Sequence, residues 1–144
     1  MPAPQTEPIG LEVTRTAKVL SRAFDEALGE GGGSLPTWLV LVSLVGGTHG
    51  TQRDLAEAVG IEGATLSHHL GRMEAAGVVT RRRDPENRRA QQVELTSIGE
   101  ETFRSLLQHV ATFDRQLRAG FTAKELAQLR GYLDRLRVNA AKGG

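Results

Sequence analysis

Ser67, His68 and His69 are the adjacent residues of this 144-residue sequence best suited to chemistry. A serine beside a histidine suggests a nucleophile and its base, and paired histidines suggest metal ligands. Neighbouring residues on a helix do not face one another, so this serine and histidine cannot act together. The positions four residues on are Arg72 and Met73, which leaves no helical pair of metal ligands. The spacing therefore predicts neither an enzyme nor a local metal site, and a metal site assembled from distant residues stays open as the weaker alternative.

The composition narrows the classes of protein further. Cysteine is absent, which excludes disulfides, a thiol redox sensor and a zinc–thiolate site, and we expect no cofactor. The length suits one domain. The sequence has no apolar run long enough for a membrane span and no signal-peptide pattern, so we expect a cytoplasmic protein with no membrane partner. The formal net charge is only +1, but residues 72–89 hold six basic and three acidic side chains, an excess typical of a patch that contacts nucleic acid.

The residues around this basic patch predict two helices followed by a hairpin. The predicted elements are helices at residues 51–59 and 64–76, then strands at residues 78–83 and 90–96 around a turn at residues 84–87. Thr51 caps the first helix, and Gly60 and Gly77 end the two helices. This order is that of a winged helix-turn-helix. In that motif the second helix enters the DNA major groove, and a basic wing can reach the neighbouring minor groove.

The second predicted helix has one apolar face and one face of small and polar residues. The residues expected to pack inward, at spacings of three and four, are Leu66, Leu70, Met73 and Ala76. The opposite face holds Ala64, Ser67, His68, Gly71 and Arg72. Small and hydrogen-bonding side chains leave this second face free to lie against another surface.

The sequence resembles the MarR family of bacterial transcriptional regulators. The resemblance is carried by ATLSHHLGRMEAAGVVTRRRDPENRRAQQVELTSIGEE, in which the family's recognition helix, wing and V-x-L-T-x-x-G pattern stand in one register. One departure is Asn87, since the family's wing often has a second Asp at this position. If that Asp normally braces the wing arginine, a neutral hydrogen bond replaces a charged one here.

The resemblance implies which side chains contact DNA. Ser67 and His68 match family positions that touch bases or phosphates. Arg72 is expected at a phosphate, and Arg89 matches the family's wing arginine, expected in the minor groove. The full set of expected DNA contacts is Thr51, Gln52, Ala64, Thr65, Ser67, His68, Arg72, Arg82, Arg88 and Arg89.

Two of these expectations have structural alternatives. Thr51 and Gln52 open the first helix, where backbone N–H groups can hold a phosphate, but Thr51 can equally be no more than the helix cap. Residues 81–83 are all arginine and alternate along a strand, so they cannot all face DNA. At least one of them should pair with an acidic neighbour.

Further helices are predicted on both sides of this motif. Amphipathic patterns place them at residues 9–28, 96–117 and 122–139, the last with a capping box of Thr122 and Glu125, and the apolar run Leu35–Val45 is favoured as a helix by Pro36. Residues 29–34 are predicted to be a flexible connector. Apolar faces this long suit a dimer, which the resemblance also implies. The expected fold is therefore mainly α with a small β-wing, a winged helix-turn-helix flanked by N- and C-terminal dimerisation helices.

The expected divisions of the chain follow these roles. They are residues 1–34, an N-terminal dimerisation helix and Gly-rich connector; residues 35–98, the DNA-binding lobe; and residues 99–144, the C-terminal dimerisation helices.

The resemblance implies a MarR-type repressor that binds a pseudo-palindromic double-stranded DNA operator as a homodimer. A small aromatic or phenolic effector is expected between the dimer helices and the DNA-binding lobe, with Trp38 and Val42 as its candidate contacts. Trp38 is the only tryptophan, and a place in the core is its simpler explanation. The alternative from another class is a winged-helix module for protein–protein contact without its own operator. Ser67, His68 and Arg72 on the exposed helix face argue against that module.

Overall fold

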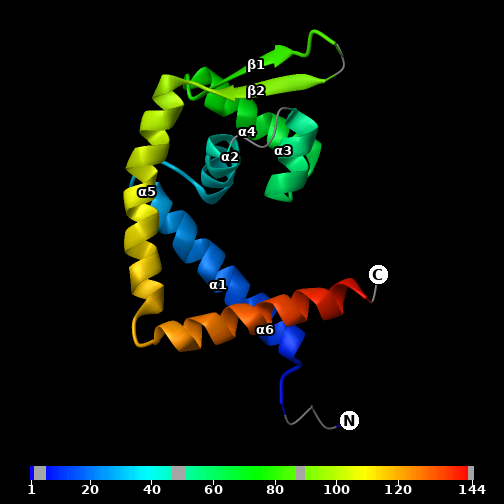
Figure 1. Ribbon diagram of the computed structural model, residues 1–144, viewed down its shortest axis with the longest axis vertical. Helices are drawn as coiled ribbons and strands as arrows, with labels where there is room; N and C mark the ends of the chain where they lie inside the picture. The colour runs from blue at the N-terminus through cyan, green and yellow to red at the C-terminus, as the bar shows by residue number, and fades with distance from the viewer. Residues whose placement is uncertain (2–5, 47–50, 87–89, 143–144) are drawn as a thin grey trace. The chain divides into compact units, whose positions relative to one another are not determined.

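The computed structural model describes residues 1, 6–46, 51–86 and 90–142 of the chain. In chain order the elements are α1 (Ile9–Gly29), α2 (Leu35–Val45), α3 (Gln52–Val59), α4 (Gly63–Ala75), β1 (Val79–Arg83), β2 (Gln91–Leu95), α5 (Ser97–Arg118) and α6 (Ala123–Ala141) (Figure 1). The predicted class, mainly α with a small β-wing, is confirmed. Among the described residues, no helix combines the length and the apolar character that crossing a membrane requires.

The chain forms two compact units, Met1–Val110 and Ala111–Gly144. The first unit holds α1 to α4, the β1–β2 hairpin and the beginning of α5, and the second holds the end of α5 and α6. The division after residues 34 and 98 was predicted from the roles of the segments, and it stays a prediction.

Local signals in the sequence set the ends of the helices in the first unit. Ser34 caps α2, because its hydroxyl accepts the Thr37 N–H at 3.3 Å, and Thr51 caps α3 in the same way. Gly60 follows α3 with a φ of 77°, and Gly77 follows α4 with a φ of 76°. Side chains other than glycine rarely adopt this left-handed conformation, so these two glycines end their helices as predicted.

One apolar core holds α1 to α5 and the hairpin of the first unit together. The fully buried side chains are Leu28, Val40, Leu41, Leu55, Leu66, Leu70, Val79 and Leu106. They come from six elements, with two each from α2 and α4 and one each from α1, α3, β1 and α5. In Figure 1, α2, α3 and α4 lie together beside the hairpin. This packing fixes α4 by its inner face and leaves its outer face uncovered within the first unit.

The hairpin is a short antiparallel pair whose register is set by its buried side chains. Val79 pairs with Leu95 and Arg81 with Val93, so the apolar residues of both strands fall on the core side. An isolated antiparallel bridge also joins Thr51 to Gln92. The base of the wing is therefore attached to the start of α3 as well as to its own partner strand.

Two expectations about the ends of helices were wrong. Ala76 was expected to pack inward, but it is exposed, because α4 ends at Ala75 and the chain turns at Gly77. The connector at residues 29–34 is a hydrogen-bonded turn, since the Gly33 N–H donates to the Leu28 carbonyl at 2.9 Å. A Cβ on Gly33 would approach the Leu106 side chain to 2.8 Å, so the glycine permits close packing against α5.

The second unit is organised by α6. The predicted capping box is present: the Thr122 N–H donates to Glu125 Oε1 at 2.9 Å, and the Glu125 N–H donates to the Thr122 hydroxyl at 3.1 Å. No described residue of α6 is buried, and Leu129, Tyr132 and Val138 are exposed. Of the apolar stripe of α6, Leu126, Leu133 and Leu136 are half-buried, and Leu129 is exposed.

Candidate nucleic-acid interface

The outer face of α4 gathers the side chains that the sequence assigned to it. Leu66, Leu70 and Met73 are buried and hold the helix against the core. The residues on the other side are Ala64, Thr65, His68 and Arg72, all exposed, and Ser67, which is half-buried. The predicted contacts of this helix therefore lie on one accessible surface, and their role in DNA binding stays a prediction.

The start of α3 supplies a second part of the surface. The Thr51 hydroxyl accepts the Asp54 N–H at 3.1 Å, so the predicted helix cap is confirmed. Gln52 is the first residue of the helix and is half-buried. Backbone N–H groups at a helix start favour anions, and this is the physical basis for the expected phosphate contact.

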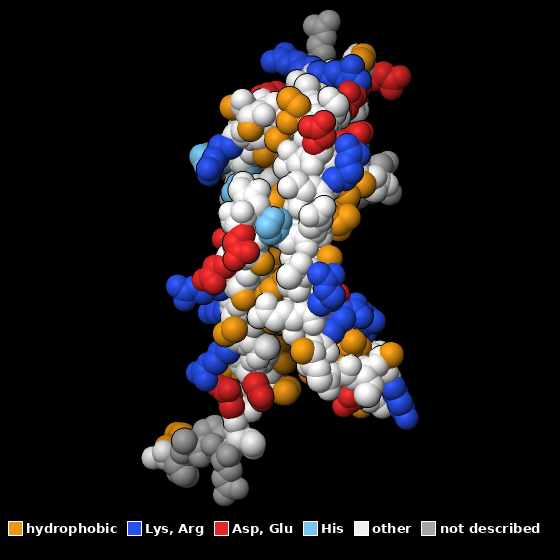
Figure 2. Space-filling model, turned by 90° about the vertical axis from the view of Figure 1, so that its left-hand side faces the viewer, with side chains coloured by type: hydrophobic (Ala, Val, Ile, Leu, Met, Phe, Trp, Pro, Cys, Tyr) orange, Lys and Arg blue, Asp and Glu red, His pale blue; other side chains and the backbone are white. Residues whose placement is uncertain are grey.

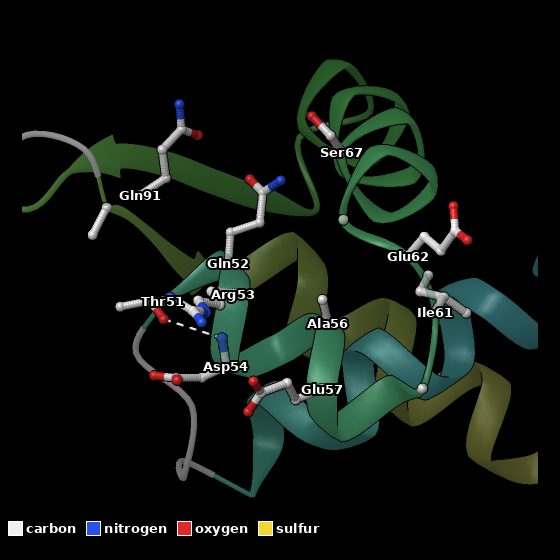
Figure 3. Close-up of a pocket in the computed structure, with 13 residues that line it drawn as sticks. Thr51, Gln52, Arg53, Asp54, Ala56, Glu57, Ile61, Glu62, Ser67 and Gln91 are labelled. Atoms are coloured by element: carbon white, nitrogen blue, oxygen red, sulfur yellow. Dashed lines mark hydrogen bonds between the residues drawn. The ribbon is translucent and has the colours of Figure 1, made fainter.

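An open groove of about 1140 Å³ lies between α3, the start of α4 and the start of β2. Figure 3 shows the Gln52, Ser67 and Gln91 side chains on the upper side of α3, where they come from three different elements. Asp54 and Glu57 lie below them in that view, on the other side of the helix. The groove is therefore lined by neutral hydrogen-bonding groups together with charged side chains, which include Glu62 at the start of α4.

Arginines of β1 pair with acidic side chains, as the alternation predicted for at least one of them. Arg81 lies 3.3 Å from Glu74 of α4, and Arg82 pairs with Glu94 of β2. The Arg82 side chain remains exposed, and its expected DNA contact stays a prediction. Figure 2 shows basic and acidic side chains next to one another at the wing end of the first unit. Among the described arginines of β1, Arg81 and Arg82 therefore have acidic partners.

The turn of the wing is only partly described. Asp84 accepts the Glu86 N–H at 2.9 Å and the Gln92 side-chain amide at 3.1 Å, which fixes the start of the predicted turn. Asn87, Arg88 and Arg89 lie outside the described residues. The expected minor-groove contacts of the two arginines, and the effect of Asn87 on them, stay predictions.

The two expected ligand contacts differ in their surroundings. Trp38 is 7% exposed and stacks on Phe103, with ring centroids 5.1 Å apart, so it is part of the core. Val42 is exposed. Neither residue lines the groove beside α3 or a second hollow of about 350 Å³, which is bounded by Leu44, Val45, Leu95, Glu100, Phe103 and Arg104. Their role in ligand binding stays a prediction.

Sequence reasoning missed the residues of that second hollow. Phe103 and Glu100 lie within the helix predicted at residues 96–117, and no site was assigned to them from the sequence. The available signal was the four-residue spacing of Glu100 and Arg104, which places opposite charges on one helix face beside Phe103. Among the residues that the structure describes, no group of three or more His, Cys, Asp or Glu side chains could hold a metal ion.

Comparisons with known proteins agree with this geometry. Residues 33–90 match the model of the MarR family. The chain is 36% identical over 89 residues to YdgJ of Bacillus subtilis strain 168, an uncharacterized HTH-type transcriptional regulator. This match covers 62% of the chain and 54% of YdgJ, so the chain spans about half the length of this curated relative. These similarities are to transcriptional regulators and not to enzymes.

Solved structures of regulators share the fold over nearly the whole chain. A mutant of MarR from Escherichia coli, complexed with operator DNA, has a TM-score of 0.81 at 24% identity and covers 90% of this chain and 93% of its own. PcaV from Streptomyces coelicolor, in complex with its natural ligand, has a TM-score of 0.80 at 23% identity and covers 95% of this chain and 99% of its own. At these identities the likeness establishes the fold.

Proposed function

We propose that the chain, which matches the MarR family over residues 33–90, is a winged helix-turn-helix transcriptional regulator that binds a pseudo-palindromic double-stranded DNA operator as a homodimer. In this proposal the bound protein represses transcription, and a small aromatic or amphipathic ligand modulates binding. The related MarR of Escherichia coli was solved with operator DNA and PcaV with its natural ligand, which supports both parts of the proposal.

The observation that carries the proposal is the outer face of α4. Its inner face is anchored by buried leucines, while Thr65, His68 and Arg72 are exposed together and Ser67 faces the groove beside α3. A helix anchored in this way can enter a major groove without losing its packing. Hydroxyl, imidazole and guanidinium groups can donate to base edges and phosphates. Arg72 is assigned to a phosphate, and Ser67 and His68 to base edges or phosphates.

The homodimer is proposed because two helices expose several large apolar side chains. In the first unit α1 exposes Ile9, Leu11, Val19 and Leu20, and in the second unit α6 exposes Leu129, Tyr132 and Val138. Exposed apolar patches of this kind suit association between chains. A twofold dimer would present two copies of α4 about 34 Å apart, one turn of DNA. Sedimentation equilibrium tests this point, since a monomer at the concentrations that bind DNA would contradict it.

The second hollow is the proposed effector site. Phe103 and Leu44 offer apolar contact to a ring, and Arg104 offers a charged donor to a carboxylate. The volume of about 350 Å³ lies at the small end for a ligand pocket, which favours a molecule with a single ring. Trp38 would act indirectly, by supporting Phe103 from behind.

The effector site is tested by isothermal calorimetry with hydroxybenzoates and their carboxamides. The wild-type protein is expected to bind the carboxylate about tenfold more tightly than the matched carboxamide, because a charged hydrogen bond is lost in the amide. In Arg104→Gln this difference should disappear. An undiminished preference for the carboxylate in Arg104→Gln would exclude Arg104 from the site.

The DNA-binding function is tested by fluorescence anisotropy with two duplexes. One duplex is the sequence that the protein enriches from a random-sequence pool, and the other is a scrambled duplex of the same composition. We expect strong preference for the enriched duplex and affinity that falls steeply with salt, because arginine–phosphate contacts release counterions. Equal affinity for the enriched and scrambled duplexes would contradict operator binding and would favour the protein–protein interaction module.

A pair of histidine variants identifies the surface that reads the DNA. His68→Ala removes an exposed imidazole from the outer face of α4, and we expect it to lower affinity for the enriched duplex about tenfold. His69→Ala is the matched control, because it removes the same side chain from the adjacent, half-buried position. Equal effects of the two substitutions would contradict the assignment of this face.

A further inference from the structure

Arg81 of β1 contacts α4, the proposed recognition helix, through its side chain. Its Nη2 lies 3.3 Å from Glu74 Oε1, and its Nη1 lies 3.5 Å from the Ser67 hydroxyl. We propose that Arg81 is a positioning residue for operator reading, which holds Ser67 of α4 and the base of the wing in one arrangement. The inference rests on the proposed DNA-binding function and adds a specificity residue to it that does not itself contact DNA.

Glu74 binds both the backbone and the side chain of Arg81. Its Oε2 accepts the backbone N–H of Arg81 at 3.2 Å, while its Oε1 accepts the guanidinium. One carboxylate therefore orients both the strand and the side chain that the strand carries. The Arg81 side chain is 20% exposed, so water competes with this pair less than it does with a fully exposed pair.

The Arg81 side chain lies along one face of α4. Ser67, Gly71 and Glu74 follow one another at spacings of four and three, so they share one face of α4. A Cβ on Gly71 would lie 3.7 Å from Arg81 Nη2, which places the guanidinium directly over this glycine. The arginine thus lies along α4 from Glu74 to Ser67, next to the outer face that the proposed function assigns to DNA.

The strand that carries Arg81 has little freedom to shift. Arg81 pairs in register with Val93, which is buried in the core. The partner strand is attached to α3 through the Thr51–Gln92 bridge. The hairpin is therefore fixed to α4 by one strand and to α3 by the other. Replacing Arg81 therefore removes the side-chain contact between the wing and α4, while the Thr51–Gln92 bridge to α3 remains.

The contact also sets the hydrogen-bonding role of Ser67. Arginine has donors and no acceptor, so in this pair the Ser67 oxygen accepts and its hydroxyl proton is left for another partner. Ser67 lines the groove beside α3, where that proton can point to an acceptor on DNA, such as a purine N7 or a phosphate oxygen. At 3.5 Å the Ser67 contact is long, and the pair with Glu74 holds the guanidinium in place.

A direct phosphate contact by Arg81 is the competing explanation. A phosphate contact and a positioning role affect different measured quantities. Loss of a phosphate contact weakens binding to all sequences and lowers the salt dependence by about one counterion. Loss of a positioning residue lowers the preference for the operator over random DNA and leaves the salt slope unchanged.

The test measures the affinity ratio between the enriched and scrambled duplexes for three variants across a salt series. Arg81→Gln is expected to lower this ratio about tenfold, the size of one lost charged hydrogen bond, with the salt slope of the wild type. Arg83→Gln is the matched control, because it removes the same charge two residues along the same strand. It is expected to weaken both duplexes alike and keep the ratio.

Glu74→Gln separates positioning from charge. It removes a negative charge from a DNA-binding surface, so electrostatics alone predicts tighter binding to both duplexes. Positioning predicts slightly tighter binding to the scrambled duplex but a ratio about threefold lower, since the carboxylate no longer orients the arginine. Thermal melts identify any variant that is unfolded at the assay temperature, and Glu74→Gln decides the question if Arg81→Gln does not fold.

The outcomes distinguish this inference from the proposed function. A wild-type protein with no preference for the enriched duplex overturns both. A wild-type preference that folded Arg81→Gln and Glu74→Gln retain in full overturns the positioning role alone. A drop in salt slope at unchanged ratio in Arg81→Gln assigns Arg81 to a phosphate and also overturns it.

Discussion

Gly99 of α5 lies tightly against Val78 and Leu95, and replacing it with alanine tests the packing of the first unit. A Cβ at this position would lie 2.3 Å from the Val78 carbonyl oxygen and 2.5 Å from Leu95 Cδ1. The first of these atoms is backbone, so it cannot move away by a change of rotamer. The Val78 oxygen also accepts the Thr96 N–H at 3.1 Å and the Thr96 hydroxyl at 3.0 Å.

The expected cost of Gly99→Ala follows from these contacts. Overpacking a filled site costs about 1–3 kcal/mol, and displacing the Val78 carbonyl weakens hydrogen bonds worth about 1 kcal/mol each. We expect the free energy of unfolding to fall by about 3 kcal/mol. For a chain of this size, such a loss lowers the Tm by roughly 10 °C.

Circular dichroism melts of the full chain measure this shift. Gly63→Ala is the matched control, because Gly63 is also helical and a Cβ there meets nothing within 4 Å. The control should raise the stability by about 0.5 kcal/mol, since alanine loses less backbone entropy than glycine. A Tm for Gly99→Ala within measurement error of the wild-type value would refute the packing argument.

Three further substitutions test individual interactions. Thr51→Ala removes the cap of α3 and should lower the free energy of unfolding by about 1 kcal/mol in urea melts, and an unchanged midpoint would show that the cap contributes nothing. The backbone N–H of Thr122, and then its hydroxyl, hold the pKa of Glu125 below its usual value, so Thr122→Ala should raise that pKa toward the usual value in an NMR titration. Because a lowered carboxyl pKa stabilises the folded state above the unfolded pKa, this contribution should disappear as the pH falls through the folded pKa. Trp38→Ala should cost about 4 kcal/mol through lost burial and stacking on Phe103, and a cost below about 1 kcal/mol would contradict its place in the core.

Features that depend on residues close together in the sequence, such as helix ends and helix faces, could be predicted. Thr51, Gly60 and Gly77 mark helix ends through their own side chains or backbone conformations, and the structure has all three as predicted. The outer face of α4 followed from helical spacing alone, because Leu66 and Leu70 had to face the core. Ala76 was assigned wrongly because the spacing was extended one residue past the end of the helix.

Contacts between distant segments could not be predicted in this way. Alternation along β1 indicated that one of its arginines would be paired, but which one depends on where Glu74 of α4 meets the strand. The close approach of Gly33 to Leu106 depends on how α5 lies against the turn after α1. The second hollow is likewise formed by Phe103 and Arg104 where α2, β2 and α5 meet, and no local pattern in the sequence specifies that meeting.

The most direct test of the central claim is selection of DNA from a random-sequence pool by the purified full chain. The account predicts enrichment of an inverted repeat whose half-site centres lie about 10 base pairs apart, since two α4 helices of a dimer would read successive major grooves. The His68→Ala protein should enrich the same spacing with a weakened half-site sequence. A pool that stays random in sequence after selection at physiological salt would contradict operator recognition by this helix.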